Sequence, residues 1–195
     1  MEITFGLPPD SVDRASELMW EAFCGKLHRP LGGEDRAKQF LIGILDPGTL
    51  VVARDGDELL GVMVLTDSEH LSHADEWAVA RDIYGTFAAV PRLLLVAPLD
   101  TKPPPGCLYV DWIAVAPEAR GRGVGSELLA FAETVAAQRG LPALALDVID
   151  TNPRAQALYA RLGFDVESTR SAWPFRWLYQ VKSYTRMTRK LPALG

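Results

Sequence analysis

Cysteine is scarce in this chain, which has two, Cys24 and Cys107, among 195 residues. Two unpatterned cysteines provide neither a disulfide framework nor the paired spacing of a zinc site. Such sparse cysteine usage is typical of proteins that stay in a reducing compartment.

A long hydrophobic run is missing as well. The longest apolar stretch, near residues 87–99, is interrupted by Pro91 and Arg92, whereas a membrane-spanning helix needs about 20 consecutive apolar residues. No basic segment followed by an apolar one opens the chain, as a secretory signal would. We therefore expect a cytoplasmic protein without a membrane partner.

A surplus of positive charge is also lacking, because 20 Lys and Arg stand against 25 Asp and Glu, for a net charge of −5. The charge is uneven: residues 161–195 have a balance of +5, which leaves −10 on residues 1–160. This balance argues against a nucleic-acid partner and is compatible with a cationic amine substrate, although an ordinary acidic surface explains it equally well.

Length and a hydrophobic content of 48% predict one domain over residues 1–195 with a sizeable core. We expect Gly25 to end the first helix and Asp55-Gly56 to turn a hairpin. Apolar spacing predicts the following N-terminal elements: a strand over 2–5, helices over 11–23 and 34–45, and hairpin strands over 50–54 and 59–66.

A helical insertion is expected over about residues 67–106, which is longer than a tight connection needs. Ser72 and Asp75 have the spacing of a capping box, so we place one helix from His73 to about Tyr84 and another from Thr86 to Val96. The insertion either covers one side of a functional site, packs on the sheet, or forms a dimer contact. His70 and His73 lie near three carboxylates, but without a cysteine or a third histidine they predict no metal site.

The junction from Leu108 to Ser126 has the strongest functional signal. An apolar strand over 108–115 passes through Pro117 into Arg120-Gly121-Arg122-Gly123-Val124-Gly125-Ser126, which opens a helix that extends to Arg139. Glycines let backbone N–H groups approach a ligand, and the first N–H groups of a helix have no internal partner. With the positive end of the helix dipole and two arginines, the turn predicts a site for a phosphate-bearing ligand.

The glycine spacing discriminates among phosphate ligands. A dinucleotide fingerprint needs G-x-G-x-x-G and a Walker loop needs Gly-Lys-Ser/Thr, and neither is present. A nucleotide bound in another way stays an alternative, which preferential binding of NAD or ATP over CoA would support. Arg120, Gly123 and Gly125 instead resemble the acyl-CoA loop of the GNAT superfamily of N-acetyltransferases, Arg/Gln-x-x-Gly-x-Gly/Ala.

A second segment strengthens this resemblance. After an expected strand over 143–149, the residues from Asn152 to Phe164 are similar to the family's Asn-x-x-Ala-x-x-Leu-Tyr-x-x-x-Gly-Phe. The two motifs cover residues 108 to about 168, and the first hundred residues agree in general layout. The resemblance implies an α/β (α+β) fold with a mixed, mostly antiparallel sheet flanked by helices.

The resemblance also implies acetyl-CoA as co-substrate, entering where the strands 108–115 and 143–149 part. The residues that it assigns to acetyl-CoA fall in three groups: Ile113, Ala114 and Val115 for pantetheine; Arg120, Gly121, Arg122, Gly123, Val124, Gly125 and Ser126 for the pyrophosphate; and Asn152 for the CoA chain. From the residues alone, Asn152 is sufficiently explained as the cap of a helix that starts at Pro153.

Two residues are candidates for proton transfer. Tyr159 matches the family's tyrosine that protonates the departing thiolate, and a phenol suits that task, but a core aromatic would also be natural there. Asp111 interrupts an apolar strand, where burial would raise its pKa toward the range of a base that acts through water. Alternatively, Asp111 is simply bonded to a nearby backbone group or arginine.

The C-terminal part is expected to form strands over 164–168 and 177–188, with the Arg and Lys of the last strand on a solvated face. Four aromatic residues could line an acceptor pocket, pack internally or form a homodimer contact: Trp173, Phe175, Trp177 and Tyr179. The resulting hypothesis is an N-acetyltransferase in which a primary amine of a small-molecule or peptide acceptor attacks acetyl-CoA directly in a ternary complex. A non-catalytic acyl-CoA-binding sensor is the alternative.

Overall fold

The computed structural model describes residues 1–68, 75–97, 103–174 and 176–192. Its sheet has seven strands in the order β1-β2-β3-β4-β5-β7-β6, and every neighbouring pair is antiparallel except β4 with β5. The strands are β1 (Glu2–Phe5), β2 (Leu50–Asp55), β3 (Glu58–Thr66), β4 (Cys107–Val115), β5 (Ala143–Ile149), β6 (Asp165–Ser171) and β7 (Ser183–Lys190). The helices are α1 (Val12–Leu31), α2 (Glu34–Gly43), α3 (Glu76–Tyr84), α4 (Thr86–Val96), α5 (Val124–Gln138), α6 (Pro153–Arg161) and α7 (Arg176–Tyr179), with 3-10 turns η1 (Pro9–Ser11) and η3 (Pro117–Ala119).

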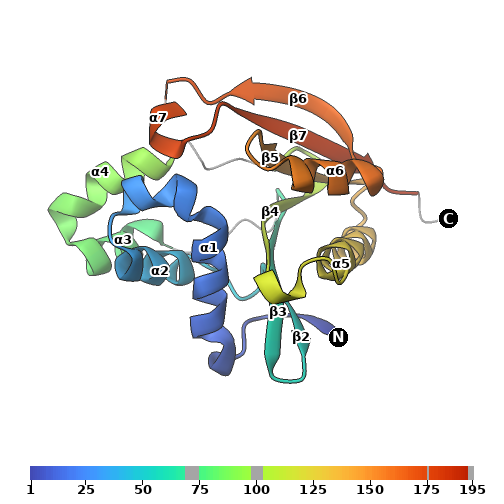
Figure 1. The fold of residues 1–195 in the computed structure, drawn as a ribbon, viewed down its shortest axis with the longest axis horizontal. Coiled ribbons are helices and arrows are strands. Elements are labelled where there is room, and N and C mark those ends of the chain that lie inside the picture. Colours follow the sequence, from blue (N-terminus) through green and yellow to red (C-terminus); the bar gives the residue numbers. More distant parts are fainter. Residues whose placement is uncertain (69–74, 98–102, 175, 193–195) are drawn as a thin grey trace.

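The helices lie on both sides of the sheet. Figure 1 shows α1 to α4 gathered on one side and α5 and α6 on the other. The central strand β3 is buried from its second residue onward, as expected for a strand covered on both faces. The expected mixed, mostly antiparallel sheet flanked by helices is therefore confirmed.

The parallel pair β4–β5 separates partway along. The two strands pair from Cys107 with Ala143 to Val110 with Leu146, and no further. Beyond that point β4 stays paired with β3, while β5 stays paired with β7. The second half of β4 therefore has an edge that β5 does not occupy.

A β-bulge coincides with this separation. Trp112 pairs with Val64 of β3 and Val110 pairs with Leu65, so Asp111 is the residue that the bulge inserts into β4. A bulge bends the strand and re-aims the side chains that follow it. The separation and the bulge therefore fall at the same point of β4.

Helix α1 is longer than the sequence predicted. It continues past Gly25 and ends before Gly32, whose φ is 80°. The continuation buries Leu27 and Leu31, which are 6% and 1% exposed. Burial of two leucines outweighs the cost of about 1 kcal/mol for a glycine within a helix, so the expected stop at Gly25 is wrong.

The expected strand over 177–188 is also partly wrong, because Arg176–Tyr179 forms the helical turn α7 and β7 begins only at Ser183. The Tyr179 hydroxyl donates a hydrogen bond of 2.7 Å to the Leu95 carbonyl of α4. Leu178 and Tyr179 pack in a small cluster next to α4 and β5. These contacts between distant segments hold the turn, and alternation along the sequence does not reveal them.

The two helices expected over 73–84 and 86–96 are present, the first with a corrected start. Asp75 is the N-cap of α3, and its carboxylate accepts a hydrogen bond of 3.0 Å from the Ala78 N–H. The helix begins at Glu76, three residues later than expected. Ser72, His70 and His73 lie outside the described residues.

No helix in the described part of the chain is long and apolar enough to cross a membrane. No group of three or more His, Cys, Asp or Glu side chains there is arranged to hold a metal ion.

Close packing of β3 on β4 leads to a first prediction. A Cβ at Gly61 would lie 2.9 Å from the Ala114 carbonyl oxygen, 3.2 Å from Leu128 and 3.3 Å from Val124. We expect Gly61→Ala to lower the free energy of unfolding, measured in urea, by about 1–3 kcal/mol because the backbone of β4 must shift. Gly33→Ala is the control, since a Cβ there meets nothing within 4 Å, and should cost less than about 1 kcal/mol. Equal losses would contradict the argument.

Candidate functional site

The glycine turn between β4 and α5 depends on backbone conformations that favour glycine. Gly121 and Gly123 have φ values of 80° and 89°, and Gly123 is the N-cap of α5, which begins at Val124. A Cβ at either glycine would meet no atom within 4 Å, so conformation and not crowding requires glycine there. Helix α5 starts two residues before the expected Ser126, and residues 120–123 are exposed.

The turn offers several backbone donors. The Arg122 N–H donates to the Ala119 carbonyl, and the Ser126 N–H donates to the Gly123 carbonyl. Within the described chain, no hydrogen bond to a backbone carbonyl engages the N–H groups of Gly121, Gly123, Val124 and Gly125. These donors sit beside the positive end of the α5 dipole, which is the arrangement that binds anions at helix N-termini.

Arg120 and Gly125 connect the turn to the neighbouring elements. The Arg120 Nε donates a hydrogen bond of 3.2 Å to the Val115 carbonyl at the end of β4. A Cβ at Gly125 would lie 3.7 Å from Val115 and 3.8 Å from Leu158 of α6. The first turn of α5 therefore lies between the end of β4 and α6.

The expected pantetheine strand lies beyond the last β4–β5 pair. Ile113, Ala114 and Val115 pair with β3 only. Ala114 is buried, and Ile113 and Val115 are half-buried. The structure thus places these three residues at the end of β4, on the part of the strand that does not pair with β5, and the 3-10 turn η3 connects them to the glycine turn.

Tyr159 lies in α6 next to Leu158 and is 6% exposed. Its ring packs against Phe164 with the centroids 5.9 Å apart. Burial raises the pKa of Tyr159 to about 12, so the phenol keeps its proton at neutral pH. This geometry suits both a core aromatic and a proton donor.

Asp111 is exposed, which corrects the expectation of a buried carboxylate. The bulge explains the difference, because the strict alternation that predicted burial ends where the extra residue is inserted. The argument that burial would raise its pKa therefore no longer applies. Asp111 still lies one residue past the last β4–β5 pair, at the point where the strands part.

Asn152 is the N-cap of α6, as the sequence predicted. Its side-chain oxygen accepts a hydrogen bond of 3.1 Å from the Ala155 N–H, and Pro153 occupies the first position of the helix. Asn152 is exposed, so its side chain also lies at the surface that a ligand at the helix start would reach.

The sheet contains a charged cluster that the sequence did not predict. Asp147 of β5, whose side chain is 10% exposed, accepts hydrogen bonds of 2.9 and 3.1 Å from Arg186 and of 2.8 Å from Arg170. The bonds to Asp147 raise the pKa of Arg186, whose side chain is only 14% exposed. The expectation that the Arg residues of the last strand lie on a solvated face is thus wrong for Arg186. The alternation of residues along β7 does not reveal that Arg186 pairs with Asp147, which lies 39 residues earlier in the sequence, on the neighbouring strand β5.

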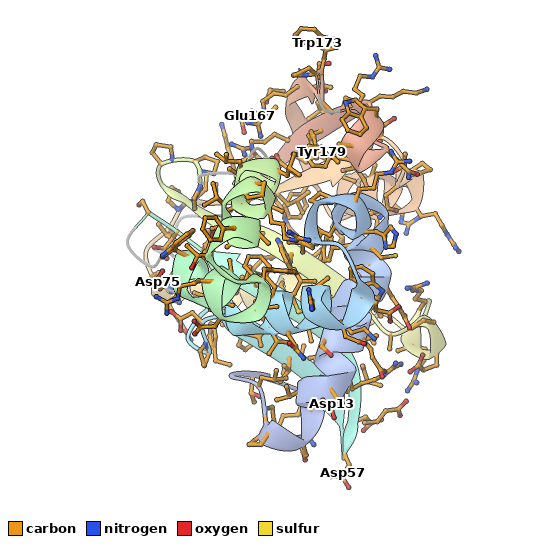
Figure 2. All side chains as sticks on the ribbon, turned by 90° about the vertical axis from the view of Figure 1, so that its left-hand side faces the viewer. Asp13, Asp57, Asp75, Glu167, Trp173 and Tyr179 are labelled. Carbon is orange, nitrogen blue, oxygen red and sulfur yellow. The ribbon has the colours of Figure 1, made fainter. Side chains whose placement is uncertain are left out.

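The expected aromatic wall is only partly formed. Trp173 and Trp177 are 76% and 68% exposed, while Tyr179 is buried. Figure 2 shows Trp173 projecting from one end of the molecule. Phe175 lies outside the described residues.

The Asn152 cap leads to a second prediction. We expect Asn152→Ala to lower the free energy of unfolding by about 1 kcal/mol, because the Ala155 N–H loses its acceptor. Asn152→Asp keeps an acceptor at the same place and should retain most of that stability. Urea titrations of the three proteins measure both effects, and an equal loss in both variants would refute capping as the cause.

The sequence profile of the acetyltransferase (GNAT) family matches residues 12–164. Among curated relatives, thialysine N-epsilon-acetyltransferase of Bos taurus is 38% identical over 66 residues, which cover 34% of this chain and 39% of the relative. Mycothiol acetyltransferase of Acidimicrobium ferrooxidans is 44% identical over 70 residues, covering 35% of this chain and 22% of the relative. The chain thus spans well under half the length of these relatives.

A solved structure supports the fold. The crystal structure of an N-acetyltransferase from Staphylococcus aureus Mu50 superposes with a TM-score of 0.67 at 17% identity, covering 96% of this chain and 100% of the other. At that identity the likeness concerns the fold alone. Because the family profile spans most of the chain and the fold agrees with it, the protein belongs to the acetyltransferase (GNAT) family.

Proposed function

We propose that the protein is an N-acetyltransferase that moves an acetyl group from acetyl-CoA to a primary amine. The observation that supports this most is the exposed glycine turn at the start of α5, which follows the half of β4 that does not pair with β5. A ligand that pairs its amides with this half of β4 can therefore reach the backbone donors of the glycine turn with its phosphates. Membership of the GNAT family, which uses acetyl-CoA as co-substrate, supports the same activity.

The described residues fit acetyl-CoA in three places. The N–H groups of residues 123–125 and the guanidinium groups of Arg120 and Arg122 match the charge of a pyrophosphate. The edge of Ile113 to Val115 that β5 does not occupy can pair with the amides of pantetheine, as a strand edge pairs with an extended chain. Asn152, exposed at the start of α6, is the proposed contact to the CoA chain.

The proposed chemistry is direct attack of the neutral amine nitrogen on the thioester carbon. The new C–N bond forms as the C–S bond breaks, and backbone N–H groups of β4 stabilise the charge that develops on the carbonyl oxygen. Tyr159 donates its proton to the departing thiolate. Asp111, exposed at the strand separation, takes the proton of the amine through water, so no covalent intermediate with the protein is needed.

The acceptor is proposed as a small-molecule or peptide amine. The bovine relative is named for acetylation at the ε nitrogen of thialysine, which supports an amine acceptor. No observation in the described structure favours a non-catalytic acyl-CoA sensor, although that alternative shares the same binding turn. The homodimer also stays a prediction, supported by the exposure of Trp173 and Trp177.

Calorimetric titration with acetyl-CoA tests the proposed site. We expect saturable binding of acetyl-CoA and none of NAD. Replacing both Arg120 and Arg122 with Gln should weaken acetyl-CoA binding about 10-fold to 100-fold, because two charge-assisted contacts to phosphate are lost. Arg81→Gln, which removes an exposed arginine of α3, is the matched control and should leave the affinity unchanged. Absence of acetyl-CoA binding in folded protein would overturn the proposal.

Replacement of Tyr159 by Phe tests catalysis separately from binding. We expect kcat to fall about 10²-fold to 10⁴-fold with an unchanged acetyl-CoA affinity, because the ring is kept and only the proton donor is lost. Since the pKa of Tyr159 is raised to about 12, the wild-type rate should show no loss from this group below pH 10. Tyr84→Phe removes another buried hydroxyl, distant in sequence on α3, and is the control. An unchanged kcat in Tyr159→Phe would show that Tyr159 contributes to core packing and not to proton transfer.

A further inference from the structure

The charged cluster of Asp147, Arg170 and Arg186 begins on β5 at the point where this strand parts from β4. Asp147 is the first residue of β5 after the last β4–β5 pair. Asp111 is the corresponding first residue on β4. Both arginines bond directly to the Asp147 carboxylate, and Asp147 lies at the point where the strands part.

The two arginines differ in the number of hydrogen bonds that they donate to Asp147 and in their exposure to solvent. Arg186 binds both carboxylate oxygens of Asp147, and its side chain is 14% exposed. Its guanidinium also lies over the Tyr109 ring, 5.4 Å from the centroid. Arg170 makes one bond of 2.8 Å to the oxygen Oδ2, and 55% of its side chain is exposed. Arg186 alone is thus sufficient to neutralise Asp147.

Arg170 consequently adds a positive charge that the cluster does not need. Two arginines and one aspartate leave a net charge of +1, in a chain whose overall charge is −5. Two other acidic groups of this region form hydrogen bonds outside the cluster: Glu167 accepts one from Thr188, and Asp150 accepts from the N–H groups of Lys182 and Ser183.

The bond to Asp147 fixes the direction of the Arg170 guanidinium without using most of its donors. A guanidinium has five N–H groups, and the described residues take up one from Arg170. An oriented guanidinium with spare donors binds a carboxylate through two parallel hydrogen bonds.

We propose that Arg170 binds a carboxylate carried by the acceptor, so the acceptor class is an amine with its own carboxylate, such as a free amino acid. This inference rests on the proposed acetyltransferase function. Asp111 on the other diverging strand complements it, because an exposed carboxylate there attracts the ammonium form of the same molecule. Arg170 is then a specificity residue and Asp147 the residue that positions it.

Matched pairs of amines test the inference. The probes are lysine with 1,5-diaminopentane, ornithine with 1,4-diaminobutane, and methionine with 3-(methylthio)propylamine, each pair differing by the carboxylate. CoA release gives kcat/KM for every amine. We expect at least one carboxylated member to exceed its partner about 10-fold or more, the discrimination that a well-oriented charged contact provides.

The variant Arg170→Gln should bring this ratio close to one by lowering kcat/KM for the carboxylated amine alone. Arg170→Lys, which keeps the charge without the planar fork, should recover part of the ratio. Arg81→Gln should retain it, and acetyl-CoA affinity should be unchanged in all three variants. Because the side chain is largely exposed, Arg170→Gln should also unfold at nearly the wild-type urea concentration.

Three results would overturn the inference while leaving the acetyltransferase proposal intact. In each, the protein binds acetyl-CoA: the amines are acetylated without preference for the carboxylate, the preference survives in Arg170→Gln, or none of the carboxylated probes is acetylated. A protein that fails to bind acetyl-CoA would overturn the proposed function and this inference together. The calorimetric titration therefore separates the two failures.

Discussion

Backbone N–H and C=O groups inside a sheet need partners, and β4 loses one of its partner strands halfway along. Tyr109 and Val110 are paired on both sides, whereas Trp112 to Val115 pair with β3 and not with β5. The bulge at Asp111 lies between these two parts of the strand. A strand edge that its neighbour leaves is where an extended, amide-containing ligand can form backbone hydrogen bonds, so the proposed site depends on this separation.

The glycine turn takes its position from the same strand. Arg120 binds the Val115 carbonyl, and Gly125 allows α5 to approach both Val115 and Leu158. The donors at the start of α5 are thus fixed next to the open edge and next to the helix that carries Tyr159. Phosphate binding, thioester positioning and proton donation are proposed for three elements that meet at the end of β4.

The charges follow the same geometry. The chain is acidic over residues 1–160 and basic over 161–195, and the cluster of Asp147 with Arg170 and Arg186 joins the two parts across β5, β6 and β7. Arg186 binds both carboxylate oxygens of Asp147 and so compensates the charge of this largely buried group. The exposed Arg170 is the member that keeps donors for another molecule.

Local patterns in the sequence determined the order of the elements, the glycine turn and the Asn152 cap. Each depends on neighbouring residues: apolar spacing, the conformational freedom of Gly121 and Gly123, and the reach of an Asn side chain to the N–H three residues on. The extension of α1 to Leu31, the turn α7, the exposure of Asp111 and the bonds of Asp147 were decided by tertiary structure. They depend on contacts between segments far apart in the chain, such as Tyr179 with Leu95 and Asp147 with Arg186, and periodicity contains no information about such partners.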